Sequence, residues 1–121
     1  MIRGIRGAIT VKQNDAEEMV ESTKRLLDEM IVKNELVPER VAQVLISVTE
    51  ELDAVFPAKA MRLLEGWTFV PVMCMREIPV KSSLQKCIRI MMTVETDIPQ
   101  DQIEHIYLEG ATVLRPDLSK K

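Results

Sequence analysis

Alternation between apolar and other side chains is clearest over residues 86–94, where it predicts a β-strand with two unlike faces. One face is uniformly apolar and carries Ile88, Ile90, Met92 and Val94. The other face carries Cys87, Arg89, Met91 and Thr93. A guanidinium in so apolar a segment is at least partly desolvated, so it needs a paired carboxylate or an anion. On this strand alone, Arg89 is equally well explained by a structural ion pair, by an edge-strand position that reaches water, or by an anion site.

Four further stretches have the alternation or composition of strands, over residues 2–11, 41–49, 67–75 and 104–114. In the first, Arg6 lies opposite Ile5 and Ile9, among small residues that let a ligand come close, although an ordinary surface arginine fits equally well. In the last, Tyr107 also lies opposite an apolar face. Pro71 interrupts the third of these stretches and indicates an edge strand or a bulge.

Two stretches have the signals of helices. Asn14, with Glu17 three residues later, resembles a capping box and predicts the start of a helix. Apolar residues recur at helical spacing through the following turns, opposite a charged face. A second helix is predicted over residues 56–64, with Pro57 in its first turn and Gly66 ending it.

Together these elements predict an α+β fold with a mixed five-stranded sheet and two main helices. The helices are expected to cover the isoleucine-rich face of the sheet. That arrangement leaves the face with Arg6, Arg89 and Tyr107 without a helix of its own. A partner subunit is the natural candidate to cover it.

The length of 121 residues suits one domain, expected over residues 1–117, with residues 118–121 as a frayed tail. Cys74 and Cys87 are too few for a disulfide framework and have no metal-binding spacing, which favours a reduced, cytoplasmic protein without a metal. The single histidine, His105, is expected to be an exposed strand residue, because no nucleophile motif accompanies it.

A net charge of −3 and a pI near 5.2 argue against a general nucleic-acid-binding surface, which needs clustered excess lysine and arginine. No apolar run approaches the length that spans a bilayer, and no signal peptide is evident, so no membrane partner is expected. Any anion binding must therefore come from a local pocket.

Five segments of the chain, read together, resemble one enzyme family. They are residues 2–8 (IRGIRGA), 54–60 (AVFPAKA), 70–75 (VPVMCM), 87–89 (CIR) and 113–117 (VLRPD). In this order they are similar to the AroH-class monofunctional chorismate mutases. The resemblance implies a homotrimer of α+β subunits whose sheets form a pseudo-α/β-barrel, with three active sites in clefts between neighbouring subunits. It also implies the conversion of chorismate to prephenate, on the route to phenylalanine and tyrosine.

The resemblance further implies the roles of particular residues. Arg6 would contact a substrate carboxylate, and Arg89 the ether oxygen and a carboxylate. Glu77 and Cys74 would meet the ring hydroxyl, and Tyr107 would bond the side-chain carboxylate. The remaining residues that would wall the cleft or guard its mouth are Phe56, Ala58, Lys59, Arg62, Val72, Met73, Leu114 and Arg115.

The chemistry of the reaction agrees with what the sequence offers. Chorismate is a dianion that rearranges in one pericyclic step, so no nucleophile, general acid, general base, metal or cofactor is expected. A fixed guanidinium at the breaking ether oxygen and a carboxylate near the ring fragment would stabilise the separating charges. Two alternatives remain open: an imine deaminase of similar trimeric fold, and a non-catalytic module that senses a small anion.

Overall fold

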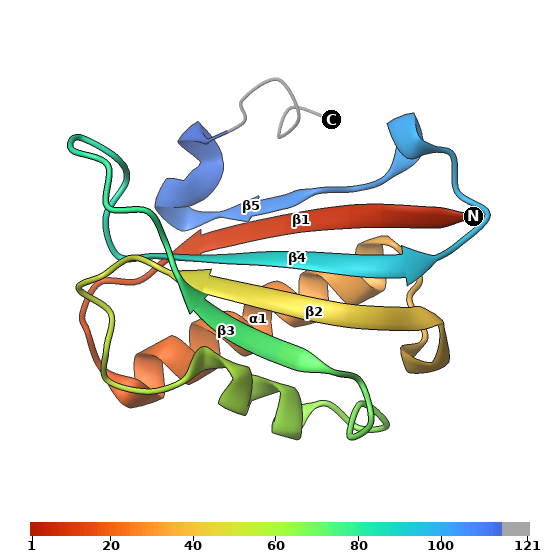
Figure 1. Cartoon of the computed structure of the whole chain (residues 1–121), viewed down its shortest axis with the longest axis horizontal. Coiled ribbons are helices and arrows are strands. Elements are labelled where there is room, and N and C mark those ends of the chain that lie inside the picture. The colour runs from red at the N-terminus through yellow and green to blue at the C-terminus, as the bar shows by residue number, and fades with distance from the viewer. Residues whose placement is uncertain (115–121) are drawn as a thin grey trace.

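The computed structural model describes residues 1–114, which form one mixed five-stranded sheet with a long helix behind it (Figure 1). The strands are β1 (Ile2–Thr10), β2 (Val41–Val48), β3 (Val72–Arg76), β4 (Cys87–Glu95) and β5 (Ile106–Leu108). Their order across the sheet is β3-β2-β4-β1-β5. The β1/β4 and β2/β4 pairs are antiparallel, and the β1/β5 and β2/β3 pairs are parallel. The predicted α+β sheet is therefore confirmed, with β4 at its centre.

The two faces of β4 are divided as the alternation predicts. Ile88, Ile90 and Met92 are almost completely buried on the inner face. Arg89 and Met91 point to the outer face and remain exposed. Because β4 is the central strand, the edge-strand interpretation of Arg89 is excluded.

The long helix α1 (Ala16–Lys33) covers the inner face of the sheet (Figure 1). Its N-cap is Asp15, whose carboxylate accepts a hydrogen bond from the Glu18 amide at 2.9 Å, so the prediction of Asn14 as the cap is wrong by one residue. Asn14 instead holds a distant loop, because its amide can donate and accept at once. It donates to the Asp53 carboxylate at 2.7 Å and accepts from the Ala54 amide at 3.1 Å.

The second predicted helix forms as a 3₁₀ helix, η2 (Pro57–Leu63), next to α1 and β3. Its buried residues Pro57 and Ala60 are three positions apart, which matches the three-residue turn of a 3₁₀ helix. Shorter 3₁₀ helices are η1 (Pro38–Arg40) and η3 (Gln100–Gln102). Proline begins η1 at Pro38 and directly precedes η3 at Pro99.

Two predicted strands are shorter in the structure. The third begins only at Val72. Before it, the Val70 amide donates to the Trp67 carbonyl in a turn that buries both side chains, and Pro71 has no amide to donate. The last strand ends at Leu108, where Glu109 adopts a positive φ of 53° and starts the 3₁₀ helix η4 (Glu109–Val113).

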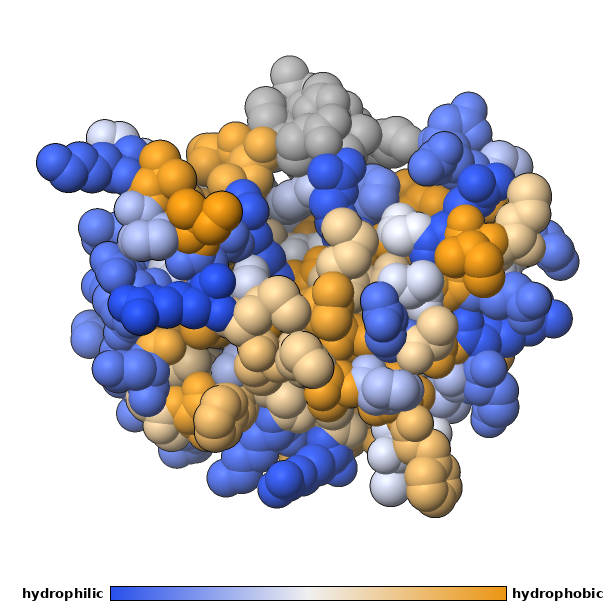
Figure 2. Space-filling view, in the orientation of Figure 1, coloured by the Kyte–Doolittle hydropathy of each residue, from blue (hydrophilic) through white to orange (hydrophobic). Residues whose placement is uncertain are grey.

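The outer face of the sheet has no helix over its centre (Figure 1). Apolar side chains gather across the middle of this face, between charged margins (Figure 2). Leu45, Met75 and Met91 lie here, and the last two are 41% and 39% exposed. Within residues 1–114, no helix combines the length and the apolar character that crossing a bilayer requires.

Candidate functional site

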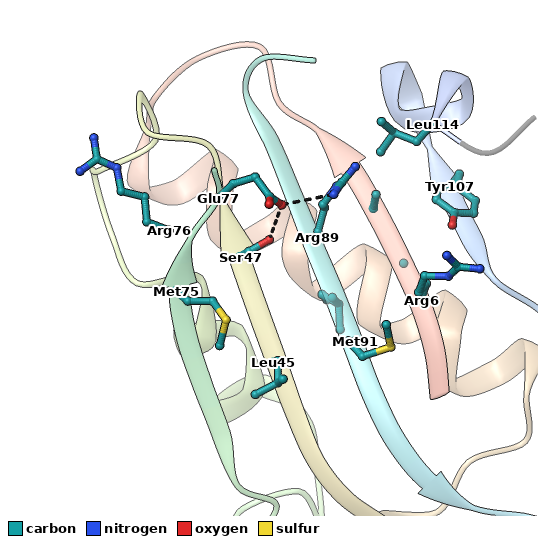
Figure 3. Close-up of a pocket in the computed structure, with 13 residues that line it drawn as sticks. Arg6, Leu45, Ser47, Met75, Arg76, Glu77, Arg89, Met91, Tyr107 and Leu114 are labelled. Atoms are coloured by element: carbon teal, nitrogen blue, oxygen red, sulfur yellow. Dashed lines mark hydrogen bonds and ion pairs between the residues drawn. The ribbon is translucent and has the colours of Figure 1, made fainter. Parts of the chain in front are cut away.

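A hollow of about 450 Å³ lies on the outer face of the sheet, and we call it the arginine hollow (Figure 3). Every strand contributes to it. Its walls are Arg6, Gly7, Ala8, Leu45, Ser47, Met75, Arg76, Glu77, Arg89, Ile90, Met91, Tyr107 and Leu114. Such a mixture of apolar walls and a few convergent charges is typical of a small-molecule site.

The two central arginines reach the hollow from neighbouring antiparallel strands. Arg89 on β4 pairs in register with Ala8, and Arg6 on β1 pairs with Met91, so both side chains leave the same face of the sheet. Tyr107 on β5 pairs in register with Ala8 from the other side. The strand register thus brings together three polar groups that lie far apart in the sequence.

His105 fixes the backbone beneath one of these arginines. The amide of Arg6 donates to His105 Nδ1 at 3.0 Å, so this nitrogen carries no proton of its own. His105 is half-buried and lies just before β5, which corrects the expectation of an exposed strand residue. Its ring therefore extends the attachment of the β5 region to β1.

Glu77 follows the last residue of β3 and turns its carboxylate into the arginine hollow (Figure 3). Its Oε2 atom accepts from Ser47 Oγ at 3.0 Å and from Arg89 Nη1 at 3.4 Å. Its Oε1 atom accepts from the Ile78 amide at 3.3 Å. The ion pair expected as one explanation of Arg89 is thus present, yet the Arg89 side chain remains 48% exposed.

Positive charge exceeds negative charge in this hollow. Arg6 and Arg89 face a single carboxylate, Glu77. The third arginine, Arg76, lies at the margin and pairs with Glu50 at 2.9 Å. Within residues 1–114, the Arg6 guanidinium has no carboxylate partner inside the hollow, which favours an anionic ligand.

A network of hydrogen bonds, which we call the Glu51 network, holds the start of β4 just before Arg89. The carboxylate of Glu51 accepts from the Thr49 hydroxyl and from the Lys86 amide, and the Thr49 hydroxyl also accepts from the Cys87 amide at 3.1 Å. Burial alone would raise the pKa of Glu51, but these hydrogen bonds outweigh it and lower the pKa below its ordinary value of 4.5. The Glu51 network connects the residues that follow β2 to the start of β4.

A small apolar cluster supports the hollow from the β5 side. It consists of Ala8, Cys87 and Ala111, with Tyr107 and Leu114 packed against it. Burial raises the pKa of the Cys87 thiol to about 11, although nearby Arg89 partly opposes this. Cys87 is therefore a neutral packing residue here.

A second hollow, of about 850 Å³, lies beside η2 and β3, and we call it the η2 hollow. It contains seven of the residues singled out by the sequence: Phe56, Ala58, Lys59, Arg62, Val72, Met73 and Cys74. Burial raises the pKa of the Cys74 thiol, and a hydrogen bond with the Ala58 backbone opposes this only in part. Cys74 is therefore a thiol at neutral pH.

The candidate residues thus separate into two groups within one chain. Arg6, Glu77, Arg89, Tyr107 and Leu114 line the arginine hollow, and the other seven line the η2 hollow. Arg115 lies outside the described residues. Cys74 and Glu77, expected to meet one hydroxyl, line different hollows of the same chain.

Eight residues that line the arginine hollow were not among the predicted site residues: Gly7, Ala8, Leu45, Ser47, Met75, Arg76, Ile90 and Met91. The sequence did contain a signal that could have predicted Ser47 as an outward-facing residue. It is a polar residue within the apolar run of residues 41–49, and by alternation it lies opposite the buried Val44 and Ile46.

A mixed sheet with the long helix on one face and a cationic hollow on the other is suited to a protein that acts on a small anion. Comparison with known proteins defines it further. The family model of chorismate mutase type I matches residues 2–118. The chain belongs to the chorismate mutase type I family.

Individual relatives agree along nearly the whole chain. It is 60% identical over 119 residues to the chorismate mutase AroH of Bacillus subtilis (strain 168), covering 98% of this chain and 94% of the relative. It is 44% identical over 119 residues to the AroH of Thermus thermophilus, covering 98% and 97%. A solved chorismate mutase from Clostridium thermocellum superposes with a TM-score of 0.88 at 50% identity, covering 91% of this chain and 97% of that one.

Proposed function

We propose that the arginine hollow is the half of the active site that holds the reacting bonds of chorismate. The activity is that of the family: the chain is a chorismate mutase, an isomerase that converts chorismate to prephenate in the biosynthesis of phenylalanine and tyrosine. The observation that carries the proposal is the convergence of Arg6, Arg89 and Glu77 on one hollow with excess positive charge. Chorismate is a dianion, so its charge complements that excess.

Arg89 and Glu77 would act on the transition state. The breaking ether oxygen gains negative charge, which the Arg89 guanidinium stabilises, and the ring fragment gains positive charge, which the Glu77 carboxylate stabilises. Both charges are larger in the transition state than in bound chorismate, so both contacts accelerate the reaction as well as bind the substrate. The Arg89–Glu77 contact at 3.4 Å holds the two opposite charges side by side before substrate arrives.

Arg6 and Tyr107 would bind and orient the carboxylates of chorismate. Both come from the strands next to Arg89, on the same face of the sheet. Holding the flexible enolpyruvyl arm over the ring makes the reacting carbons meet more often, which lowers the entropic part of the barrier. Leu114 would close one apolar side of the cleft.

We further propose that the active chain is a homotrimer, with each site formed where two subunits meet. The division of the candidate residues between two hollows of one chain supports this arrangement, because a neighbour's η2 hollow could complete the arginine hollow. The apolar outer face supports it too, since exposed apolar patches commonly mark interfaces. Phe56 and Met73 line the η2 hollow and are 77% and 63% exposed in the single chain.

A cytoplasmic location is part of the proposal. Cys74 and Cys87 are free thiols, and free thiols are typical of reducing compartments.

The activity is tested by following the loss of chorismate absorbance after adding purified protein without any cofactor, with prephenate identified as the product. We expect rapid conversion, abolished by Arg89→Ala. Arg40→Ala is the matched control, because Arg40 is an exposed arginine outside both hollows. A folded protein that binds chorismate without converting it would be an anion sensor, and the proposal would be wrong.

The shared site is tested by mixing two inactive variants. Arg89→Ala disables the arginine hollow, and Cys74→Phe fills the η2 hollow with a bulky ring. When equal amounts are unfolded and refolded together, random assembly gives about one quarter of the intersubunit sites two intact halves, with activity to match. Sites formed within single chains would recover no activity, and sedimentation of the wild type as a monomer would also contradict the trimer.

A further inference from the structure

Ser47 is the polar residue of the arginine hollow that neither the family resemblance nor the charge pattern explains. It lies on β2, between β4, which carries Arg89, and β3, which Glu77 directly follows. The strand register pairs it with Arg89 on β4 and with Met75 on β3. Its side chain points to the outer face, into the hollow (Figure 3).

Among residues 1–114, the Ser47 hydroxyl makes the shortest hydrogen bond to the Glu77 carboxylate. It donates to Oε2 at 3.0 Å, compared with 3.4 Å for Arg89 Nη1 at the same oxygen and 3.3 Å for the Ile78 amide at Oε1. Ser47 and Arg89 therefore share one acceptor atom. The contact with Arg89 uses a single guanidinium nitrogen.

Glu77 needs such a support because of its place in the chain. It follows the end of β3 and begins the loop that leads to β4, and its amide donates to the Val48 carbonyl at 2.8 Å, at the very end of the sheet. A carboxylate and a guanidinium left to themselves tend to pair through two parallel hydrogen bonds. Such a bidentate pair would occupy the fork of Arg89 that the substrate's oxygens need.

We propose that Ser47 is a positioning residue that holds the Glu77 carboxylate in a monodentate contact with Arg89, so that the guanidinium fork stays available to substrate. The proposal rests on the roles proposed above for Glu77 and Arg89. Ser47 acts through Glu77 and touches neither reacting bond. Its removal lets Glu77 turn toward Arg89, which weakens the transition-state contacts of both groups.

The test uses two substitutions of equal shape. Ser47→Thr keeps the hydroxyl and Ser47→Val replaces it with a methyl group, so any cost of the added bulk cancels between them. We expect Ser47→Thr to keep most of the wild-type kcat. We expect Ser47→Val to lower kcat about tenfold relative to Ser47→Thr, the order of effect of one hydrogen bond to a charged group. Thermal unfolding should give similar midpoints for the two variants.

The same pair in a Glu77→Ala background shows how Ser47 acts. Without the carboxylate, Ser47→Val and Ser47→Thr should have equal kcat, because Ser47 has nothing left to hold. A tenfold difference that persists there would mean that the hydroxyl contacts substrate directly, and it would overturn the positioning role. Equal kcat in the background that keeps Glu77 would overturn it as well.

The failure of this inference is distinguishable from the failure of the proposed site. If Glu77→Ala alone keeps wild-type kcat, the role proposed for Glu77 is wrong. If Glu77→Ala is severely impaired while Ser47→Val matches Ser47→Thr, the site stands and only the inference about Ser47 is wrong.

Discussion

Replacing Arg89 with lysine keeps a positive charge at the centre of the sheet but removes the planar fork that two oxygens can share. In the free enzyme Arg89 Nη1 lies 3.4 Å from Glu77 Oε2, and about half of the arginine side chain is exposed. At that separation, Coulomb's law gives about 1 kcal/mol for two unit charges in water and about 5 kcal/mol at an effective dielectric constant of about 20. The guanidinium therefore contributes most when substrate has displaced water from the hollow.

Removing one preorganised donor from a developing oxyanion typically costs about 3–4 kcal/mol, or about 10²–10³ in kcat. Because lysine retains the charge, we expect the loss for Arg89→Lys to lie near the lower end of this range, with kcat about a hundredfold below wild type. The half-exposed pair with Glu77 contributes at most about 1 kcal/mol to stability, so the variant should remain folded. A large loss of turnover with little loss of stability is thus the expected signature.

The measurement is kcat at saturating chorismate, followed by absorbance, together with a thermal unfolding curve of the same sample. Arg40→Lys is the control for a change of arginine to lysine outside the two hollows. A folded Arg89→Lys enzyme with near-wild-type kcat would show that a point charge suffices. The two-oxygen contact assigned to Arg89 would then be refuted.

Three other predictions concern the scaffold of the site. A Cβ at Gly7 would lie 2.5 Å from Met30 Sδ, so Gly7→Ala should lower the free energy of unfolding by about 1–3 kcal/mol. The measurement is a urea titration, and an unchanged midpoint would contradict that packing. The folded-state pKa of Glu51 is lowered from 4.5, so its hydrogen bonds stabilise the fold above that pH and lose their effect as the pH falls through the lowered value. Glu51→Gln should therefore lower the free energy of unfolding by about 1 kcal/mol relative to wild type at pH 7, and this difference should shrink below about pH 4.5. A difference that stays constant with pH would show that the charge of Glu51 is irrelevant. Burial raises the pKa of Cys87 to about 11, so at pH 8 a thiol reagent should label half-exposed Cys74 first. Mass spectrometry that found Cys87 modified in the folded protein would contradict this.

The sheet faces could be predicted from the sequence because β4 is long and its alternation has only one consistent reading. Arg89 and Met91 lie outward and Ile88 and Ile90 lie inward, as the period of two requires. The position of β4 at the centre of the sheet could not be predicted in the same way. Strand order depends on pairing between distant segments, and that order is what excludes the edge-strand explanation of Arg89.

The errors have local physical causes. Trp67 and Val70 are apolar enough to suggest a strand, but they are buried by turning back into the core before Pro71. Asn14 and Asp15 are both good caps, and only the backbone geometry decides between them. Periodicity reports which residues avoid water, and it does not report by which backbone path they do so.

The contacts of the candidate site lie beyond reach of the sequence pattern for a different reason. Ser47 and Glu77 are 30 residues apart, and they meet only because β2 pairs in parallel with β3. His105 meets the Arg6 amide across 99 residues through the β1/β5 pairing. The alternation placed Arg89 on the correct face, but the partners on that face depend on the register of all five strands.

The central position of β4 also determines when this protein can fold during synthesis. Both β1 and β2 pair with β4, which leaves the ribosome after most of the chain has been made. Until then the early strands lack their common neighbour, although α1 can already form from local contacts. Closing such long loops is entropically costly, so the sheet should assemble late and comparatively slowly. A nascent chain that stops before residue 87 could still pair β2 with β3, but β1 and the β4-facing edge of β2 would stay unpaired, so we expect it to be a substrate for chaperones and proteases rather than a partly working enzyme.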